Sequence, residues 1–185
     1  MRVITGSARG RRLRELEGQD TRPTTDRVKE GLFSAIQFEI EGRRVLDLFA
    51  GTGQLGVEAL SRGAASATFV DSSPKAFAVV RDNLQITGLS DRAAVTQSDA
   101  LDFLSRTRER FDLIFLDPPY QSGLLGEAIK RIAAFDILKP RGIIAAEYPR
   151  ASTLPAPPPS IRAGRTYRYG KIAVTLFHRE DAPDL

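Results

Sequence analysis

The sequence predicts an α/β fold in which helices cover both faces of a mostly parallel β-sheet. Short apolar runs alternate with helical patterns between residues 43 and 142, as expected for parallel strands joined by right-handed crossovers. A glycine-rich turn follows the first apolar run, and an aspartate ends the second. The chain has 185 residues, of which 42% are hydrophobic and 27% charged, which suits one domain with one core.

Five strands are expected in this central part. They are residues 43–49, 66–71, 93–97, 111–116 and 142–147. The large apolar residues of 111–116 indicate a central strand that is buried on both faces. One intervening helix begins at Ser73-Pro74, with serine as N-cap and proline at the first helical position, and stops at Gly88. Residues 139–141 (Lys-Pro-Arg) are expected to form the turn before the fifth strand.

The two flanks of the chain differ from the centre. We expect a small basic β-hairpin over residues 1–20, followed by one domain over residues 21–185 that opens on a helix with apolar positions from Val28 to Ile40. Residues 167–171 predict a turn into an antiparallel strand over 172–177. The expected sheet is therefore mostly parallel, with an antiparallel C-terminal strand.

Composition excludes several classes of protein. The chain has no cysteine and one histidine, so disulfides are excluded and we expect no metal site. It has no apolar run of the roughly 18 residues that a membrane span needs, and its N-terminus turns polar too early for a secretory signal. We therefore expect a cytoplasmic protein with no membrane association, and a monomer by default.

Basic residues are concentrated near the two ends. Residues 1–14 and 161–179 each contain five lysines or arginines and no acid, whereas the whole chain has a net charge of +4, so the remainder is acidic. Such a distribution predicts a polyanion-binding surface built from the two ends of the chain. We expect nucleic acid to be the partner.

The glycine-rich turn is expected to hold a nucleoside cofactor. Residues 51–56 (Gly-Thr-Gly-Gln-Leu-Gly) match G-x-G-x-x-G between a strand and a helix, where free backbone N–H groups can approach a ligand. Asp71 lies twenty residues after Gly51, where a carboxylate can bind ribose hydroxyls. Both features fit a nicotinamide cofactor as well as a methyl donor. Asp47 favours the methyl donor, because a carboxylate in the first strand would attract an ammonium or sulfonium and repel a pyrophosphate.

The predicted catalytic motif is the tetrapeptide Asp117-Pro118-Pro119-Tyr120, which ends the fourth strand. Two prolines lock the backbone and remove two N–H donors. The acceptors that remain, the Asp117 carboxylate and the Pro118 carbonyl, could accept the two protons of an exocyclic amine and direct its lone pair at a methyl group. Tyr120 could stack on a flipped-out base.

These motifs resemble Class I S-adenosylmethionine-dependent methyltransferases, which are Rossmann-like. The resemblance implies a mostly parallel seven-stranded sheet, with one strand more than the six located above. Residues 47–53 (Asp-Leu-Phe-Ala-Gly-Thr-Gly) are similar to D-x-F-x-G-x-G, residues 98–100 to the adenine-contacting motif, and residues 117–120 to [D/N/S]-P-P-[Y/F/W] of the amino-group branch. Three N-terminal segments resemble the RsmD family, whose members methylate guanine N2 in bacterial 16S ribosomal RNA. They are Arg2–Gly6, Gly10–Leu13 and Arg22–Phe33. This resemblance covers essentially the whole chain.

The resemblance implies a role for each motif. The cofactor would be S-adenosylmethionine, without a metal, and the partner would be 16S rRNA in the small ribosomal subunit or an assembly intermediate. The implied cofactor-binding residues are Asp47, Phe49, Ala50, Gly51, Thr52, Gly53, Asp71, Ser72, Asp99, Ala100 and, less directly, Thr25. The implied catalytic residues are Asp117, Pro118, Pro119 and Tyr120. We also expect the basic N-terminal hairpin and the first helix to grip RNA through Arg9, Arg11, Arg12, Arg14 and Arg27.

Other functions remain open at this level. The same chemistry would serve adenine N6 in DNA or RNA, or a glutamine amide of a protein. A dehydrogenase would leave the tetrapeptide without a role. A non-catalytic RNA-binding assembly factor could retain the cofactor pocket, although the intact Asp117 and Tyr120 argue against it.

Overall fold

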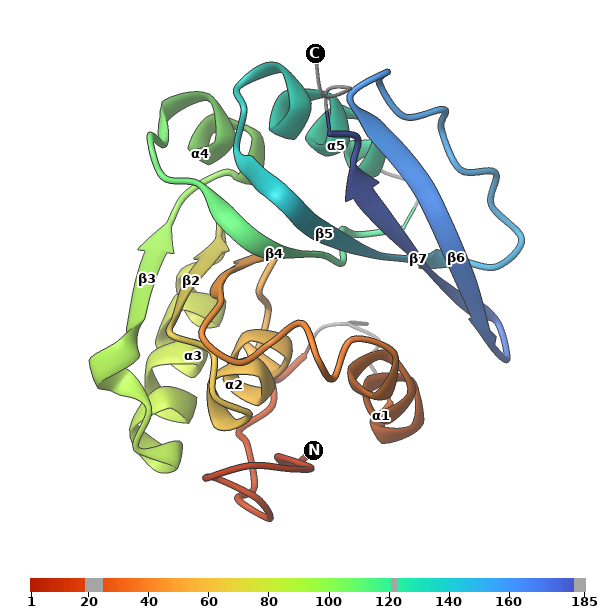
Figure 1. Ribbon diagram of the computed structural model, residues 1–185. Coiled ribbons are helices and arrows are strands. Elements are labelled where there is room, and N and C mark those ends of the chain that lie inside the picture. The colour runs from red at the N-terminus through yellow and green to blue at the C-terminus, as the bar shows by residue number, and fades with distance from the viewer. Residues whose placement is uncertain (19–24, 121–122, 182–185) are drawn as a thin grey trace.

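The computed structural model describes residues 1–18, 25–120 and 123–181, and it has a seven-stranded sheet at its centre (Figure 1). The strand order is β3-β2-β1-β4-β5-β7-β6. The strands are β1 Arg44–Leu48, β2 Ser66–Asp71, β3 Ala93–Gln97, β4 Phe111–Leu116, β5 Leu138–Pro149, β6 Ile161–Tyr169 and β7 Ile172–Arg179. Strands β1 to β5 pair in parallel, and β7 pairs antiparallel with both of its neighbours. The predicted fold class is confirmed.

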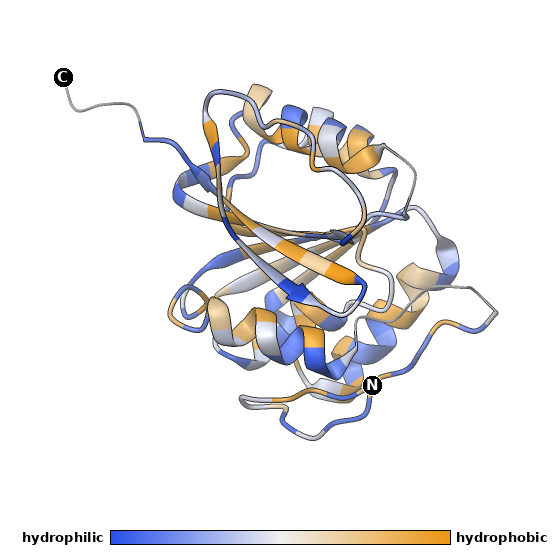
Figure 2. Cartoon of the chain, turned by 90° about the vertical axis from the view of Figure 1, so that its right-hand side faces the viewer, coloured by the Kyte–Doolittle hydropathy of each residue, from blue (hydrophilic) through white to orange (hydrophobic). Residues whose placement is uncertain are grey.

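Helices cover both faces of the sheet (Figure 2). They are α1 Asp26–Ala35, α2 Gln54–Ser61, α3 Pro74–Thr87, the short 3-10 helix η1 Ser90–Arg92, α4 Ala100–Arg106 and α5 Leu124–Ala134. Alternate residues of each strand face opposite sides, so the sheet separates two apolar clusters. One cluster contains Val45, Phe69 and Phe115 with residues of α1 to α3. The other contains Leu46, Ile114 and Phe177 with residues of α4 and α5.

The strand order places a crevice at one edge of the sheet. The chain crosses to one side of β1 to form β2 and β3, and then returns to the other side to form β4 and β5. Neighbouring crossovers diverge at this point, so the carboxyl ends of β1 and β4 border an open space. Within the described residues, no helix is long and apolar enough to cross a bilayer.

Three element boundaries differ from the prediction. Helix α1 ends at Ala35, although Ile36 and Ile40 beyond it are buried as the apolar spacing suggested. Strand β5 begins at Leu138 and includes residues 139–141, because a bulge opposite β4 absorbs them and Arg141 adopts a positive φ of 60°. Residues 167–169, expected in a turn, form the end of β6 and pair with β7.

The N-terminal segment is a reduced hairpin. A single antiparallel bridge joins Arg2 and Arg12, so no regular strands form within residues 1–18. The segment is held by the rest of the chain instead: Ser7 N donates to the Ser61 carbonyl at 2.8 Å, and Arg14 N donates to the Asn83 side chain at 2.7 Å. Val3, Ala8 and Leu13 belong to the same buried cluster as α1 to α3. The segment therefore lies along α2 and is part of the core packing.

A buried charge network joins this segment to α1 and α2. The Glu58 carboxylate accepts from Ile4 N at 2.9 Å, from Thr5 N at 3.0 Å and from Arg62 Nε at 3.0 Å. Lys29 Nζ lies 3.9 Å from Glu58 and donates to the Arg2 carbonyl at 2.6 Å; the side chains of Lys29 and Glu58 are fully buried. Burial lowers the pKa of Lys29, and the Glu58 carboxylate opposes this effect.

We expect Glu58→Ala to lower the free energy of unfolding by about 3–5 kcal/mol, because it leaves the buried Lys29 without its counter-ion and two N–H groups without their acceptor. Glu127→Ala is a matched control. It removes the same kind of helical ion pair, with Arg131 at 3.0 Å and four residues on, from a partly exposed site. The control should cost less than about 0.5 kcal/mol. Urea unfolding measures both, and equal losses would contradict the role of burial.

Candidate active site

The loop after β1 has a backbone that few residues other than glycine adopt. Gly51 and Gly53 have φ values of 57° and 79°, and Phe49 has a φ of 65°. A non-glycine residue in this region stores roughly 1–3 kcal/mol of strain. The loop is held by Ala50 N, which donates to the Val70 carbonyl at 2.9 Å, and by Gly53 N, which donates to the Ala50 carbonyl at 2.7 Å. Helix α2 then begins with its free N–H groups at the crevice.

Asp47 lies beneath this loop. Its side chain is 2% exposed, and its Oδ2 accepts from Gly56 N at 2.9 Å. Gly53, the N-cap of α2, offers no side-chain bond, so the Asp47 carboxyl group satisfies one of the first N–H groups of the helix. Burial raises the pKa of Asp47 to about 8, although the Gly56 hydrogen bond opposes the shift. A cation bound next to Asp47 would therefore lower this pKa and stabilise the charged form of the carboxyl group.

Asp71, at the end of β2, holds the loop from the other side. Its Oδ2 accepts from Gly51 N at 2.9 Å, and its Oδ1 accepts from Ser73 N at 2.9 Å. The carboxylate is thereby fixed between the glycine loop and the start of α3. Each oxygen retains acceptor capacity toward the crevice, because a carboxylate has about four lone-pair sites.

Asp99 lies in the turn after β3. Its Oδ1 accepts from Asp102 N at 3.0 Å and caps α4, whose first residue Ala100 is buried. The local role of Asp99 is thus a helix cap, and its side chain also borders the cavity described next. The two roles are compatible, because capping uses one of its two oxygens.

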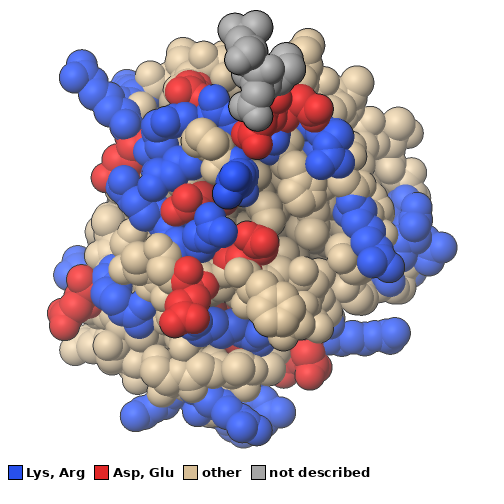
Figure 3. Space-filling model, in the orientation of Figure 1, with Lys and Arg blue, Asp and Glu red and all other residues tan. Residues whose placement is uncertain are grey.

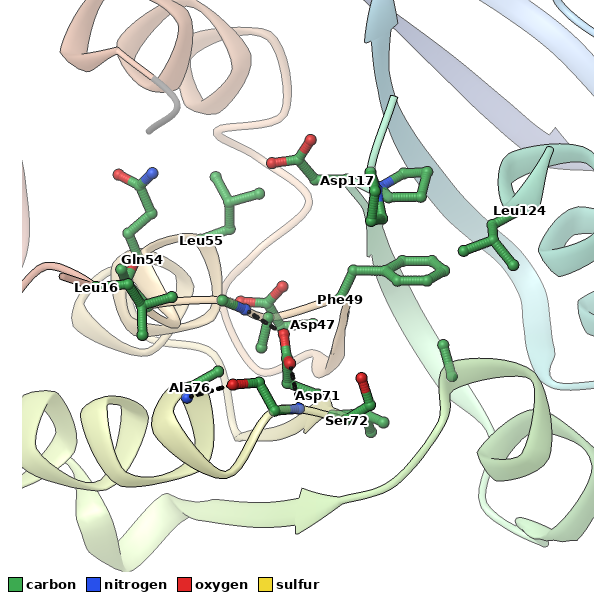
Figure 4. Close-up of a pocket in the computed structure, with 18 of the residues that line it drawn as sticks. Leu16, Asp47, Phe49, Gln54, Leu55, Asp71, Ser72, Ala76, Asp117 and Leu124 are labelled. Atoms are coloured by element: carbon green, nitrogen blue, oxygen red, sulfur yellow. Dashed lines mark hydrogen bonds between the residues drawn. The ribbon is translucent and has the colours of Figure 1, made fainter. Parts of the chain in front are cut away.

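The cavity is enclosed by the ends of four strands. It measures about 760 Å³, within the range of small-molecule sites. Figure 4 shows Asp117 and Asp71 on opposite sides of this space, with Leu55, Asp47 and Phe49 between them. Its lining comprises Met1, Glu15, Leu16, Asp47, Phe49, Ala50, Gly51, Thr52, Gln54, Leu55, Val70, Asp71, Ser72, Ser73, Ala76, Asp99, Ala100, Asp117, Pro118, Pro119, Tyr120 and Leu124.

The cavity brings together most of the site residues expected from sequence. All four residues of the tetrapeptide line it, as do the expected cofactor-binding residues except Gly53 and Thr25. Gly53 caps α2, and its backbone contributes through loop geometry. Thr25 caps α1, accepting from Val28 N at 3.3 Å, and is exposed. The structure therefore offers no support for a contact between Thr25 and the cofactor.

Several lining residues were not expected from sequence. Gln54 and Leu55 lie inside the glycine motif, whose spacing could have suggested them. Glu15 and Leu16 come from the N-terminal segment, and no local pattern points to them; only the packing of that segment along α2 places them at the cavity. The five arginines predicted to bind RNA do not line it.

The glycines of the motif have separable roles. A Cβ added to Gly56 would lie 2.3 Å from the Phe69 ring, whereas one added to Gly51 would meet no atom within 4 Å. We expect Gly56→Ala to lower the free energy of unfolding by about 1–3 kcal/mol through overpacking. Gly51→Ala should cost about 1 kcal/mol through its positive φ and should weaken ligand binding more than it weakens stability. Thermal unfolding and ligand titration of both variants check this; similar profiles would contradict it.

The chain is similar to known proteins over nearly its whole length. A family model described as "Conserved hypothetical protein 95" matches residues 1–178. The chain belongs to this family. The similarity extends to "Putative rRNA methyltransferase YlbH" of Bacillus subtilis, 41% identical over 97% of this chain and 99% of that one. "Ribosomal RNA small subunit methyltransferase D" of Escherichia coli K12 is 36% identical over 97% of this chain and 90% of that one. The expected resemblance to the RsmD family is confirmed.

Solved structures of similar proteins share the whole fold. "Putative methyltransferase yhhF" from Escherichia coli superposes with a TM-score of 0.89 at 35% identity, covering 97% of this chain and 98% of that one. A methylase from Haemophilus influenzae, described as putative, superposes with a TM-score of 0.83 at 33% identity over the same shares. The family fold thus includes the N-terminal segment as well as the sheet.

Proposed function

We propose that the chain transfers a methyl group from S-adenosylmethionine to the exocyclic N2 amine of a guanine in 16S ribosomal RNA. The observation that carries the proposal is the single cavity shared by the glycine loop and the tetrapeptide Asp117–Tyr120. Relatives of full length are named as ribosomal RNA methyltransferases, one of them as a small-subunit enzyme. The RsmD family resemblance supplies guanine N2 as the acceptor.

The residues present fit this cofactor. Asp71 offers a fixed carboxylate for two neighbouring ribose hydroxyls, and Asp99 offers one at the cavity wall for an adenine amine. Asp47, with its raised pKa, would become fully charged next to the cationic methionyl end. When bound, the cofactor supplies an electrophilic methyl group. The protein holds and orients both reactants and excludes water.

The tetrapeptide would position the acceptor. Leu116 of β4 is paired with Leu48 of β1, so Asp117 leaves the sheet beside the loop that starts at Phe49. The Asp117 carboxylate and the Pro118 carbonyl would accept the two amine protons, which orients the nitrogen lone pair and stabilises the positive charge that develops there. The ring of Tyr120 would stack on the base, which must leave its helix to reach the cavity. We assign the final loss of the amine proton to the Asp117 carboxylate.

Several further properties belong to the proposal. The substrate would be 16S rRNA within the small subunit or an assembly intermediate, and the protein would act as a cytoplasmic monomer. Residues 1–20 would form an extension of a single methyltransferase domain over 21–185. The packing of residues 1–18 on α2 and α3 supports a fixed extension.

The test is to incubate the protein with labelled S-adenosylmethionine and small ribosomal subunits from a strain lacking this methyltransferase, and to map the modified nucleoside by mass spectrometry. N2-methylguanosine at one position is expected. N6-methyladenosine would transfer the assignment to an adenine enzyme. Saturable cofactor binding with no incorporation into subunits or free RNA would favour a non-catalytic assembly factor.

A further inference from the structure

The β6–β7 hairpin reaches the same edge of the sheet as the active site. Strand β7 is antiparallel to β5 and to β6, so β6 runs in the direction of β4 and β5. The end of β6 and the turn at Gly170 and Lys171 therefore lie at the edge where Asp117 follows β4. The turn is fixed there by Arg150 N, which follows β5 and donates to the Lys171 carbonyl at 2.8 Å.

Helix α1 packs against the end of this hairpin. Gly31 allows the close approach, because a Cβ at this position would lie 2.4 Å from the Tyr169 hydroxyl. Arg27 lies one turn earlier on α1 and is exposed. Helix α1 therefore lies beside the end of β6, and the residue after β5 is hydrogen-bonded to the hairpin turn.

Four exposed basic residues surround the end of this hairpin: Arg27 on α1, Arg168 on the opposite face of β6, and Arg150 and Lys171 at the turn. We call them the carboxyl-edge cluster. Figure 3 shows basic side chains projecting from the right-hand side of the molecule, where β6 and the hairpin turn lie. No ion pair joins any of the four to an acid within the described residues. At the other end of the same hairpin, Arg162 pairs with Glu180 at 3.4 Å and Arg179 with Asp136 at 2.7 Å. In the middle of β6, Arg165 also has no ion pair within the described residues, but it lies over the Tyr167 ring. The two ends of the hairpin therefore differ: the basic residues at the far end are paired with acids, and those at the active-site end are not.

The distance between the active site and the carboxyl-edge cluster suits a nucleic-acid strand. Strand β6 is three positions from β4 in the sheet, and neighbouring strands are about 4.8 Å apart, so the end of β6 lies roughly 14 Å from the end of β4. This distance corresponds to about four stacked nucleotides at 3.4 Å each. A strand whose target base enters the cavity beside Asp117 would place its flanking phosphates over the cluster.

The N-terminal arginines are placed differently. Ser7 and Ala8 are bonded to Ser61, the last residue of α2. Because α2 starts at the carboxyl edge, its end lies toward the opposite edge of the sheet. Arg9 and Arg11, next to this turn, therefore lie away from the cavity, and Figure 1 shows this segment at the bottom of the molecule, apart from the hairpin.

We propose that the carboxyl-edge cluster binds the backbone phosphates of the RNA strand that flanks the target nucleotide, an inference that rests on the proposed function and identifies its RNA-binding surface. Three exposed arginines and one exposed lysine, at the same edge of the sheet as the catalytic motif, match a polyphosphate in charge. They make no base contacts at this distance, so they set affinity and register, and the cavity selects the base.

The test compares two triple variants with the same charge change. The first, Arg150→Gln, Arg168→Gln and Lys171→Gln, neutralises three residues of the cluster. The control, Arg106→Gln, Arg108→Gln and Lys130→Gln, neutralises two arginines and one lysine that are also exposed and have no ion pair within the described residues. They lie at the end of α4, between α4 and β4, and on α5. With small subunits as substrate, we expect the first variant to raise KM about tenfold or more, with kcat and cofactor Kd within twofold. Its log affinity should also fall less steeply with log salt, by about 0.7 for each phosphate that the variant no longer neutralises.

The control should leave KM within twofold. Equal shifts in both variants would show that net charge alone matters and would overturn the proposal, as would an unchanged KM in the first. A third variant, Arg9→Gln, Arg11→Gln and Arg12→Gln, tests whether the N-terminal arginines bind the RNA instead. A higher KM in this third variant, with no change of KM in the first, would also overturn the proposal. If the wild type transfers no methyl group, the proposed function fails, and the salt dependence of subunit binding still decides on the cluster.

Discussion

Replacing Asp117 with alanine is expected to lower kcat for methyl transfer by about 10²–10³-fold, the usual cost of removing one preorganised electrostatic contact to developing charge. The carboxylate borders the cavity at the end of β4, between two locked prolines and the glycine loop. Its proposed contacts are with the acceptor amine and not with the cofactor. The cofactor Kd should therefore change by less than about threefold, which would be about 0.7 kcal/mol.

A second variant, Asp117→Asn, separates the effect of the negative charge from that of the hydrogen-bond acceptor. The amide keeps one acceptor oxygen of the same size and loses the charge, so we expect a smaller loss, about tenfold. Single-turnover methyl transfer to small subunits measures kcat, and calorimetry measures cofactor binding. A parallel loss of cofactor affinity in Asp117→Ala, or an equal kcat for the alanine variant and the wild type, would contradict the assigned role.

Replacing Asp47 with asparagine is expected to have opposite effects on cofactor binding and on stability. The amide can still accept from Gly56 N, but it cannot offer a negative charge to the cationic methionyl end. Cofactor Kd should rise at least tenfold, because loss of a charge pair with the buried Asp47 carboxylate costs about 1.4 kcal/mol or more. In the absence of cofactor, the variant should be more stable than the wild type at alkaline pH.

The raised pKa of Asp47 determines how the free energy of unfolding changes with pH. The Asp47 carboxyl group titrates with a pKa of about 8 in the folded protein, against 3.8 for an ordinary aspartate. Between these values the folded protein retains a proton that the unfolded chain has released, so the free energy of unfolding falls as pH rises through this window. The destabilisation is complete above about pH 8 and absent below about pH 4. Asparagine does not titrate, so the advantage of the variant should grow over that interval.

Thermal unfolding between about pH 5 and pH 9 tests this, with Asp91→Asn as a control at an exposed carboxyl group on η1. The difference in Tm between Asp47→Asn and wild type should increase with pH, and that of the control should not. Cofactor binding by the wild type near neutral pH should also release protons, seen as a binding enthalpy that depends on the buffer. A flat Tm difference together with no proton release would refute the buried titration.

Much of the fold and of the candidate site could be predicted from the sequence alone. The alternation of apolar runs with helical patterns determines the parallel sheet, because each pattern reflects the faces that a strand or helix must bury. The glycine loop, Asp47, Asp71 and Asp117 were recognisable because each is a short motif at the end of a strand. In an open α/β sheet such strand ends converge at one edge, so local motifs suffice to assemble a site.

Only the tertiary structure decided the features that depend on contacts between distant segments. The burial of Lys29 against Glu58, the contribution of Leu16 to the cavity and the separation of Arg9 from the active site all follow from the packing of residues 1–18 along α2. The carboxyl-edge cluster depends on strand order and on helix packing. The antiparallel β7 brings the hairpin turn with Lys171 to Arg150 at the end of β5, and the packing of α1 on the end of β6 adds Arg27. The number of basic residues follows from the sequence. Which of them are paired with acids depends on the packing, because the partners are distant in sequence, as Arg179 and Asp136 are.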